Sequence, residues 1–129
     1  MHKEEVNMIS YVNSTLCISE SDRQDTIKCK CTLEQLKCAI KKIKDNGIKE
    51  ENVIDTPEPK NNWEDVAEYN EKIGYTSIVV NDKDKLQIAK VSIGCTDVII
   101  VKHIGTNINK QCNFITTQKD FIEELLQIV

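Results

Sequence analysis

The second half of the chain carries four runs of β-forming residues, and they constrain the fold more than any other feature. The runs cover 75–80, 85–93, 97–104 and 111–116, with Asn, Asp and Gly gathered between them. Strands joined by such short polar turns pair antiparallel, so the runs predict a four-stranded meander. The third run holds four consecutive apolar residues from Val98 to Val101, which indicates a central strand buried on both faces. Near Ala89 the alternation of the second run shifts, which predicts a β-bulge.

The first half of the chain predicts an N-terminal β-hairpin. Residues 6–18 are rich in Val, Ile, Thr and Tyr and are expected to be extended as one strand, and residues 19–25 are polar turn material. Residues 26–31 alternate apolar and charged side chains, which is typical of a half-buried strand. Residues 1–5 are expected to form a loose end.

Three segments predict helices by apolar spacing and by the residues at their ends. The first begins at Thr32, whose hydroxyl can cap free amides, and ends at Gly47. The second begins at Asn61, with Glu64 three residues later, and ends at Gly74. A third begins at Thr117 and reaches the end of the sequence. Between the first two lies an irregular acidic loop, 47–61, and loops of this length are often functional.

The resulting order predicts an α+β fold in one domain spanning 1–129. Its architecture is an antiparallel four-stranded meander with an N-terminal hairpin and three helices. The order of elements resembles that of PAS and profilin domains, although no sequence motif accompanies this topological likeness. A ferredoxin-like arrangement is the alternative.

Composition narrows the function classes. The chain has 129 residues and a net charge of −4, no apolar run of about 18 residues that could cross a membrane, and a polar N-terminus, MHKEEVNM, without a signal-peptide core. We therefore expect a cytoplasmic protein without a membrane partner. Abundant Ile, Lys and Asn indicate a low-GC genome of a bacterium or its phage. Because only one arginine and six aromatic residues are present, nucleic acid is disfavoured as a partner.

Six cysteines allow three interpretations: Cys17, Cys29, Cys31, Cys38, Cys95 and Cys112. We expect reduced, structural thiols, because the chain has enough Ile, Val and Leu to build a core without disulfides. Disulfides are one alternative. A zinc site at Cys29, Cys31 and Cys38 is the other, although the second pair of ligands usual for such sites is missing. No metal and no cofactor are predicted.

No catalytic set emerges from the sequence. Cys95, Asp97 and His103 share the chemistry of a nucleophilic triad, but eight strand residues place Cys95 about 25 Å from His103. Such a triad would need different strands to converge. Asp82 and Asp84 resemble the start of a calcium loop without its later ligands. We therefore expect a protein that is not an enzyme and has no catalytic residues.

Charge is strongly segregated along the chain. Residues 28–44 hold six lysines and one glutamate, and residues 49–72 hold eight acids and three lysines. Lys37, Lys41 and Lys44 line one strip of the first helix, where they could hold an anionic ligand. The acidic segment predicts a contact surface for a partner, formed by these residues: Glu50, Glu51, Asp55, Glu58, Trp63, Glu64 and Asp65.

These features favour a small non-catalytic protein that occupies a protein partner, such as a phage-encoded inhibitor of host defence or a toxin immunity protein. A homodimer in which the basic helix meets the acidic one is a further possibility. One alternative is a domain that binds or senses a small anionic molecule such as a nucleotide. The other alternative is a cysteine- or zinc-dependent activity.

Overall fold

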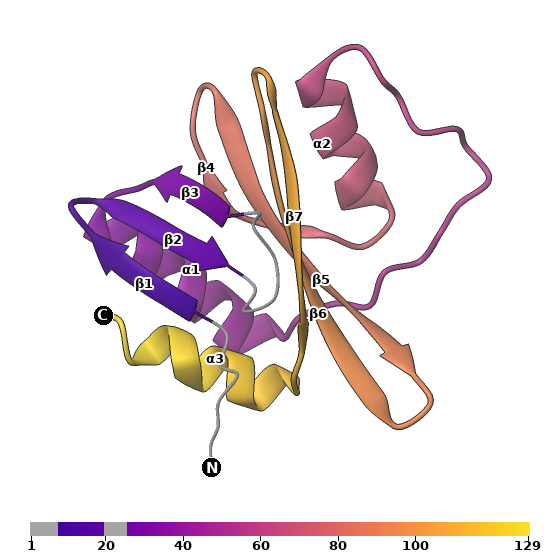
Figure 1. Ribbon diagram of the computed structural model, residues 1–129. Coiled ribbons are helices and arrows are strands. Elements are labelled where there is room, and N and C mark those ends of the chain that lie inside the picture. The colour runs from indigo at the N-terminus through magenta and orange to yellow at the C-terminus, as the bar shows by residue number, and fades with distance from the viewer. Residues whose placement is uncertain (1–7, 20–25) are drawn as a thin grey trace.

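The computed structural model describes residues 8–19 and 26–129, and it contains two antiparallel sheets and three helices (Figure 1). The smaller sheet has the order β1 (Met8–Val12), β2 (Thr15–Ser19) and β3 (Thr26–Lys30). The larger sheet has the order β4 (Thr76–Val80), β5 (Asp84–Ile93), β6 (Thr96–Gly105) and β7 (Ile108–Ile115). The helices are α1 (Leu33–Asn46), α2 (Trp63–Lys72) and α3 (Gln118–Leu126). The predicted α+β class and the predicted four-stranded meander are confirmed.

The N-terminal sheet differs from the predicted hairpin. The segment expected to be one strand over 6–18 contains a hairpin, in which β1 and β2 are joined at Asn13 and Ser14. Both turn residues have positive φ angles, 54° and 58°, the backbone of a tight two-residue turn. The strand predicted over 26–31 is β3, and it pairs with β2 to make a third strand. The expected loose end at 1–5 lies outside the described residues, as does most of the turn predicted at 19–25.

The larger sheet also corrects the predicted bulge. β5 pairs with β6 without a shift from Asp84 opposite Gly105 to Ile93 opposite Thr96. The shift lies instead in β4, between Ser77 and Val79, where Lys42 of α1 donates a hydrogen bond to the Ser77 carbonyl. β5 loses its alternation because it is covered on both faces, so that successive residues are buried.

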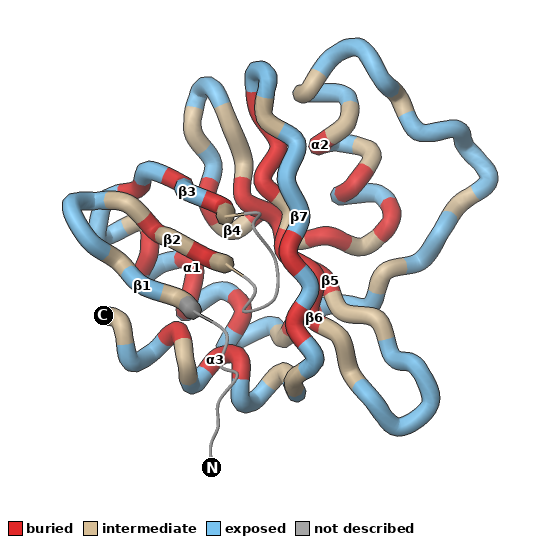
Figure 2. Tube along the Cα trace, in the orientation of Figure 1, coloured by how far each residue is buried: buried red, intermediate tan, exposed pale blue. Residues whose placement is uncertain are grey.

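The two faces of this sheet have different partners. The large-core face carries Leu86, Ile88, Ile99 and Val101, which pack into one cluster with β2, β3, α1 and α3. The α2 face carries Ala89 and Ile100, which pack with the end of α2. Figure 2 shows the buried residues running along β5, β6 and β7 between these two layers. Within the described part of the chain, no helix is both long and apolar enough to cross a membrane.

Local signals define the helix ends. The Thr32 hydroxyl accepts a hydrogen bond from the Gln35 amide, and the Gln35 side-chain oxygen accepts one from the Thr32 amide. The helix α1 therefore begins with a complete capping box. Thr117 caps α3 as predicted. The predicted cap of α2 is one residue off, because Asn62, and not Asn61, accepts the hydrogen bond from the Glu64 amide.

Candidate functional site

The predicted contact residues lie on the loop between α1 and α2 and on the first turn of α2. This loop runs far out from the body of the protein beside α2 (Figure 1). Five of the acids are exposed: Glu50, Asp55, Glu58, Glu64 and Asp65. At Glu50 the backbone of the loop forms an isolated parallel β-bridge with Lys90 of β5, which fixes the start of the loop on the larger sheet.

Glu51 has a partner inside the protein. Its side chain is half-buried and accepts a hydrogen bond of 2.8 Å from the hydroxyl of Tyr75, a residue with only 3 % of its surface exposed. Burial and the neighbouring Glu51 carboxylate raise the pKa of Tyr75 well above its usual range. Lys102 lies 4.5 Å from the centre of the Tyr75 ring. Glu51 thus anchors the loop to Tyr75.

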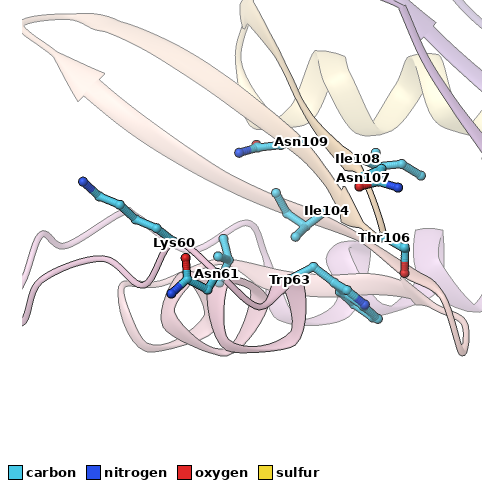
Figure 3. Close-up of a pocket in the computed structure, with 10 residues that line it drawn as sticks. Lys60, Asn61, Trp63, Ile104, Thr106, Asn107, Ile108 and Asn109 are labelled. Carbon is cyan, nitrogen blue, oxygen red and sulfur yellow. The ribbon is translucent and has the colours of Figure 1, made fainter.

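Trp63 borders a cavity of about 530 Å³ between the start of α2 and the β6–β7 hairpin. In Figure 3, Lys60, Asn61 and Trp63 lie on one side of this space, and the labelled hairpin residues lie on the other. The hairpin side is lined by Ile104, Gly105, Thr106, Asn107, Ile108 and Asn109. The indole is half-buried. The cavity, called the Trp63 cleft below, combines apolar surface with several amide side chains.

The basic strip of α1 lies on the opposite side of the larger sheet. Lys37, Lys41 and Lys44 are exposed and border a cavity of about 310 Å³ together with Leu126 and Val129. Lys41 is paired with Asp45 at 2.8 Å, and that pairing raises the pKa of Lys41. Part of the positive charge is therefore already neutralised within the helix.

A third group of chemically active side chains lies between the two sheets. Cys29 of β3, Asp84 of β5 and His103 of β6 bring a thiol sulfur, a carboxylate oxygen and a ring nitrogen within 4.8 Å of one another. His103 Nε2 lies 2.8 Å from Asp84 Oδ2, and only 2 % of the His103 surface is exposed. We call these three residues the Cys29 cluster.

Neighbouring residues hold the Asp84 carboxylate in place. Asn81 donates a hydrogen bond to Asp84 Oδ1 at 3.1 Å and a second one to the Lys30 carbonyl of β3. The Asn81 side-chain oxygen accepts one from Gln35 of α1. Opposite Asp84, a Cβ atom on Gly105 would lie 2.7 Å from Asp84 Cβ, so only glycine fits there.

The surroundings of Cys29 favour a protonated thiol. Burial, the Asp84 carboxylate and the Cys31 thiol raise the pKa of Cys29 to about 12. Burial and Asp84 also raise the pKa of Cys31. A nucleophilic cysteine needs the opposite, a lowered pKa and access to substrate. Cys29 is fully buried, so the arrangement is unsuited to attack on a substrate.

The structure separates the residue sets considered from sequence. His103 faces Asp84 across the sheet interior, Asp97 accepts a hydrogen bond from Ser92, and Cys95 is exposed on the β5–β6 turn. Cys38 is exposed on α1, whereas Cys29 and Cys31 are buried, and among the described residues the metal-competent group does not include Cys38. Asp84 points inward rather than joining Asp82 in a calcium loop. Among the described residues, no two cysteines are joined by a disulfide.

Sequence reasoning missed Asp84 and His103 as partners of Cys29. Each residue carries a usable signal, since a polar side chain on the inward face of a strand needs a partner. The sequence does not show which strands meet, because β3 and β5 belong to different sheets.

Comparison with protein-family models, curated protein sequences and solved structures finds no match for this chain. Its function is therefore argued from its own sites.

Proposed function

We propose that the chain is a non-catalytic binding protein that occupies a protein partner through the acidic loop and the Trp63 cleft. The observation that carries this proposal is the position of Trp63. A half-buried indole borders a cavity of about 530 Å³, beside exposed acids on the loop and on α2. Tryptophan is enriched among residues that dominate binding energy, especially where a cavity can exclude water around it.

The chemistry of this surface suggests what the partner presents. Apolar groups of Trp63, Ile104 and Ile108 favour an apolar side chain in the cleft. Asn107 and Asn109 offer amide groups that can pair with the backbone of a peptide segment. The exposed acids favour lysine or arginine around that segment. A basic loop or tail with one apolar anchor fits these requirements.

The biological class that we propose is an inhibitor or immunity protein of a low-GC bacterium or its phage, acting in the cytoplasm. The apolar core is large enough to be stable without disulfides, which suits a reducing compartment. An acidic protein of this kind can cover the basic surface of a toxin or a defence nuclease. The same charge separation favours head-to-tail association of two copies, through basic α1 and the acidic loop.

The test uses Trp63 as its own reporter, because it is the only tryptophan in the chain. A library of basic peptides that lack tryptophan is titrated into the protein while Trp63 emission is recorded. Binding in the cleft is expected to shift the emission to shorter wavelength, and the affinity is expected to fall with added salt. Analytical ultracentrifugation of the free protein first establishes whether it is a monomer or a dimer.

Two double variants distinguish the effect of the acidic surface on peptide binding from the effect of the net charge of the protein. Glu58→Lys with Asp65→Lys is expected to weaken binding by about tenfold or more, since each close charge contact contributes on the order of 1 kcal/mol. Lys37→Glu with Lys44→Glu, on the opposite side, is expected to leave affinity unchanged or slightly higher. If no peptide changes Trp63 emission, or if both double variants bind equally, the proposal is wrong.

A further inference from the structure

The Cys29 cluster brings together three of the donor types that zinc prefers. A thiol, an imidazole and a carboxylate come from three different strands, and their ligand atoms lie within 4.8 Å of one another. We propose that Cys29, Asp84 and His103 bind one Zn²⁺ ion, with Cys31 as the fourth ligand. This site is independent of the Trp63 cleft and of the proposed partner.

The distances require little rearrangement. In a tetrahedral zinc site, ligand atoms at bond lengths of about 2.0–2.3 Å lie roughly 3.3–3.6 Å from one another. The Asp84–His103 pair, now 2.8 Å apart, would open by about half an ångström as both atoms turn to the metal. The thiols release their protons to solvent and bind as thiolates, which is the form in which cysteine ligates zinc.

Cys31 lies beside this group but its sulfur is not among the ligand atoms within 4.8 Å of one another, so its side chain must turn toward the ion to bind as the fourth ligand. It follows Cys29 by two residues, directly after the end of β3, and both residues are buried. Its backbone is fixed by the β1–β2 hairpin, because its amide bonds to the Ser14 carbonyl and its carbonyl accepts from the Tyr11 hydroxyl at 2.7 Å. Only 5 % of its surface is exposed, and it lines the same cavity as Asp84.

The cluster has outer support and a path for the ion. Asn81 holds the second oxygen of Asp84 at 3.1 Å, as outer hydrogen bonds commonly do for zinc-binding carboxylates. Two cavities border residues of the cluster. One of about 760 Å³ is lined by Cys31 and Asp84, and one of about 340 Å³ is lined by His103.

Burial indicates a structural site and not a catalytic one. Cys29 has 0 % of its surface exposed and His103 has 2 %, so no substrate contacts them. With Cys31 as fourth ligand the coordination is closed, as in structural zinc sites. The ion would join β3 of the smaller sheet to β5 and β6 of the larger one.

The experiment titrates the reduced, metal-free full chain with Co²⁺ and then displaces it with Zn²⁺. One equivalent of Co²⁺ is expected to give the visible bands of tetrahedral cobalt and a near-ultraviolet band from the sulfur ligands. Zn²⁺ at a hundredfold excess over its Kd is expected to raise Tm by about 10 °C. Failure to bind either ion with a Kd below about 10 µM would overturn the proposal.

Variants assign the ligands. Asp84→Asn keeps the size of the side chain and is expected to weaken zinc binding by at least tenfold. Cys31→Ser is expected to halve the sulfur band, and an unchanged band would overturn its place as fourth ligand. Cys38→Ser and Cys95→Ser change exposed thiols and are expected to bind as the parent does. If Cys38→Ser weakens metal binding as much as Cys31→Ser does, the proposed ligand set is wrong and the alternative set of Cys29, Cys31 and Cys38 is favoured.

Discussion

The two faces of the larger sheet are stabilised in different ways. Among the described residues, twenty buried apolar residues form the cluster on the large-core face, and only four form the cluster on the α2 face. Because hydrophobic stabilisation scales with the apolar area removed from water, most of it comes from the large-core face. The proposed zinc site also lies on that face, whereas the Trp63 cleft lies beside α2.

On the α2 face, buried side-chain hydrogen bonds join α2 to the sheet. Asn70 of α2 donates to the side-chain oxygen of Gln87 at 2.9 Å, and Gln87 donates to the Ala67 carbonyl and to the Ser77 hydroxyl. Such buried pairs fix an orientation but add little net stability. We infer that α2 and the acidic loop are easier to displace than α1 and α3, which suits a surface that adapts to a partner.

The largest expected effect compares two neighbours on β6. Ile99 faces the large core and has 0 % of its surface exposed, whereas Ile100 faces α2 with 9 % exposed. Ile99→Ala is expected to lower the free energy of unfolding by about 4 kcal/mol, and Ile100→Ala by about 2 kcal/mol, because the smaller cluster can close around the cavity. Urea denaturation of both variants measures the difference. Equal losses would contradict the division between the two faces.

An intermediate effect tests how the loop is fastened to α2. Gly74 has a φ of 120°, and a Cβ atom there would lie 2.5 Å from the Glu50 carbonyl oxygen. Gly74→Ala is therefore expected to lower the free energy of unfolding by about 2–3 kcal/mol, since both the backbone and the loop must shift. Gly94→Ala is the control, because Gly94 also has a positive φ, 62°, but has open space around it.

That control is expected to cost about 1 kcal/mol, the contribution of the backbone conformation alone. Urea denaturation gives both values, and the expected difference is the cost of displacing Glu50. If the two variants are equally stable, the loop backbone at Glu50 does not restrict the residue at position 74.

The sequence predicts local structure well where local physics decides it. Thr32 and Thr117 are correct helix caps, and the apolar stretch around Ile99 does mark a central strand. The bulge expected near Ala89 was wrong because α2 buries a second face of β5, a tertiary effect that resembles a break in alternation. The missed turn at Asn13 and Ser14 has no glycine to mark it.

The candidate sites divide in the same way. Trp63 and the exposed acids are close in sequence, so their proximity could be predicted, although the role of Glu51 in binding Tyr75 could not. The Cys29 cluster joins residues 29, 84 and 103 through the packing of two sheets. The sequence pattern indicates that each of these side chains faces the protein interior, but it does not show which other side chains each one contacts.

The smallest expected effect concerns the charge of α3, which covers the large-core face. Burial and the neighbouring Asp120 raise the pKa of Glu124, so the folded protein disfavours its charged form. This cost is absent below pH of about 4, where the group is protonated in both states, and develops fully as pH rises through the raised pKa. Glu124→Gln is therefore expected to raise Tm slightly at pH 7 and to leave it unchanged near pH 3.

Glu123→Gln, at an exposed neighbouring position, is the control for removing a charge from α3. An equal gain from both variants would assign the effect to the net charge of the protein, and a loss in Glu124→Gln would show that this carboxylate stabilises the face it covers.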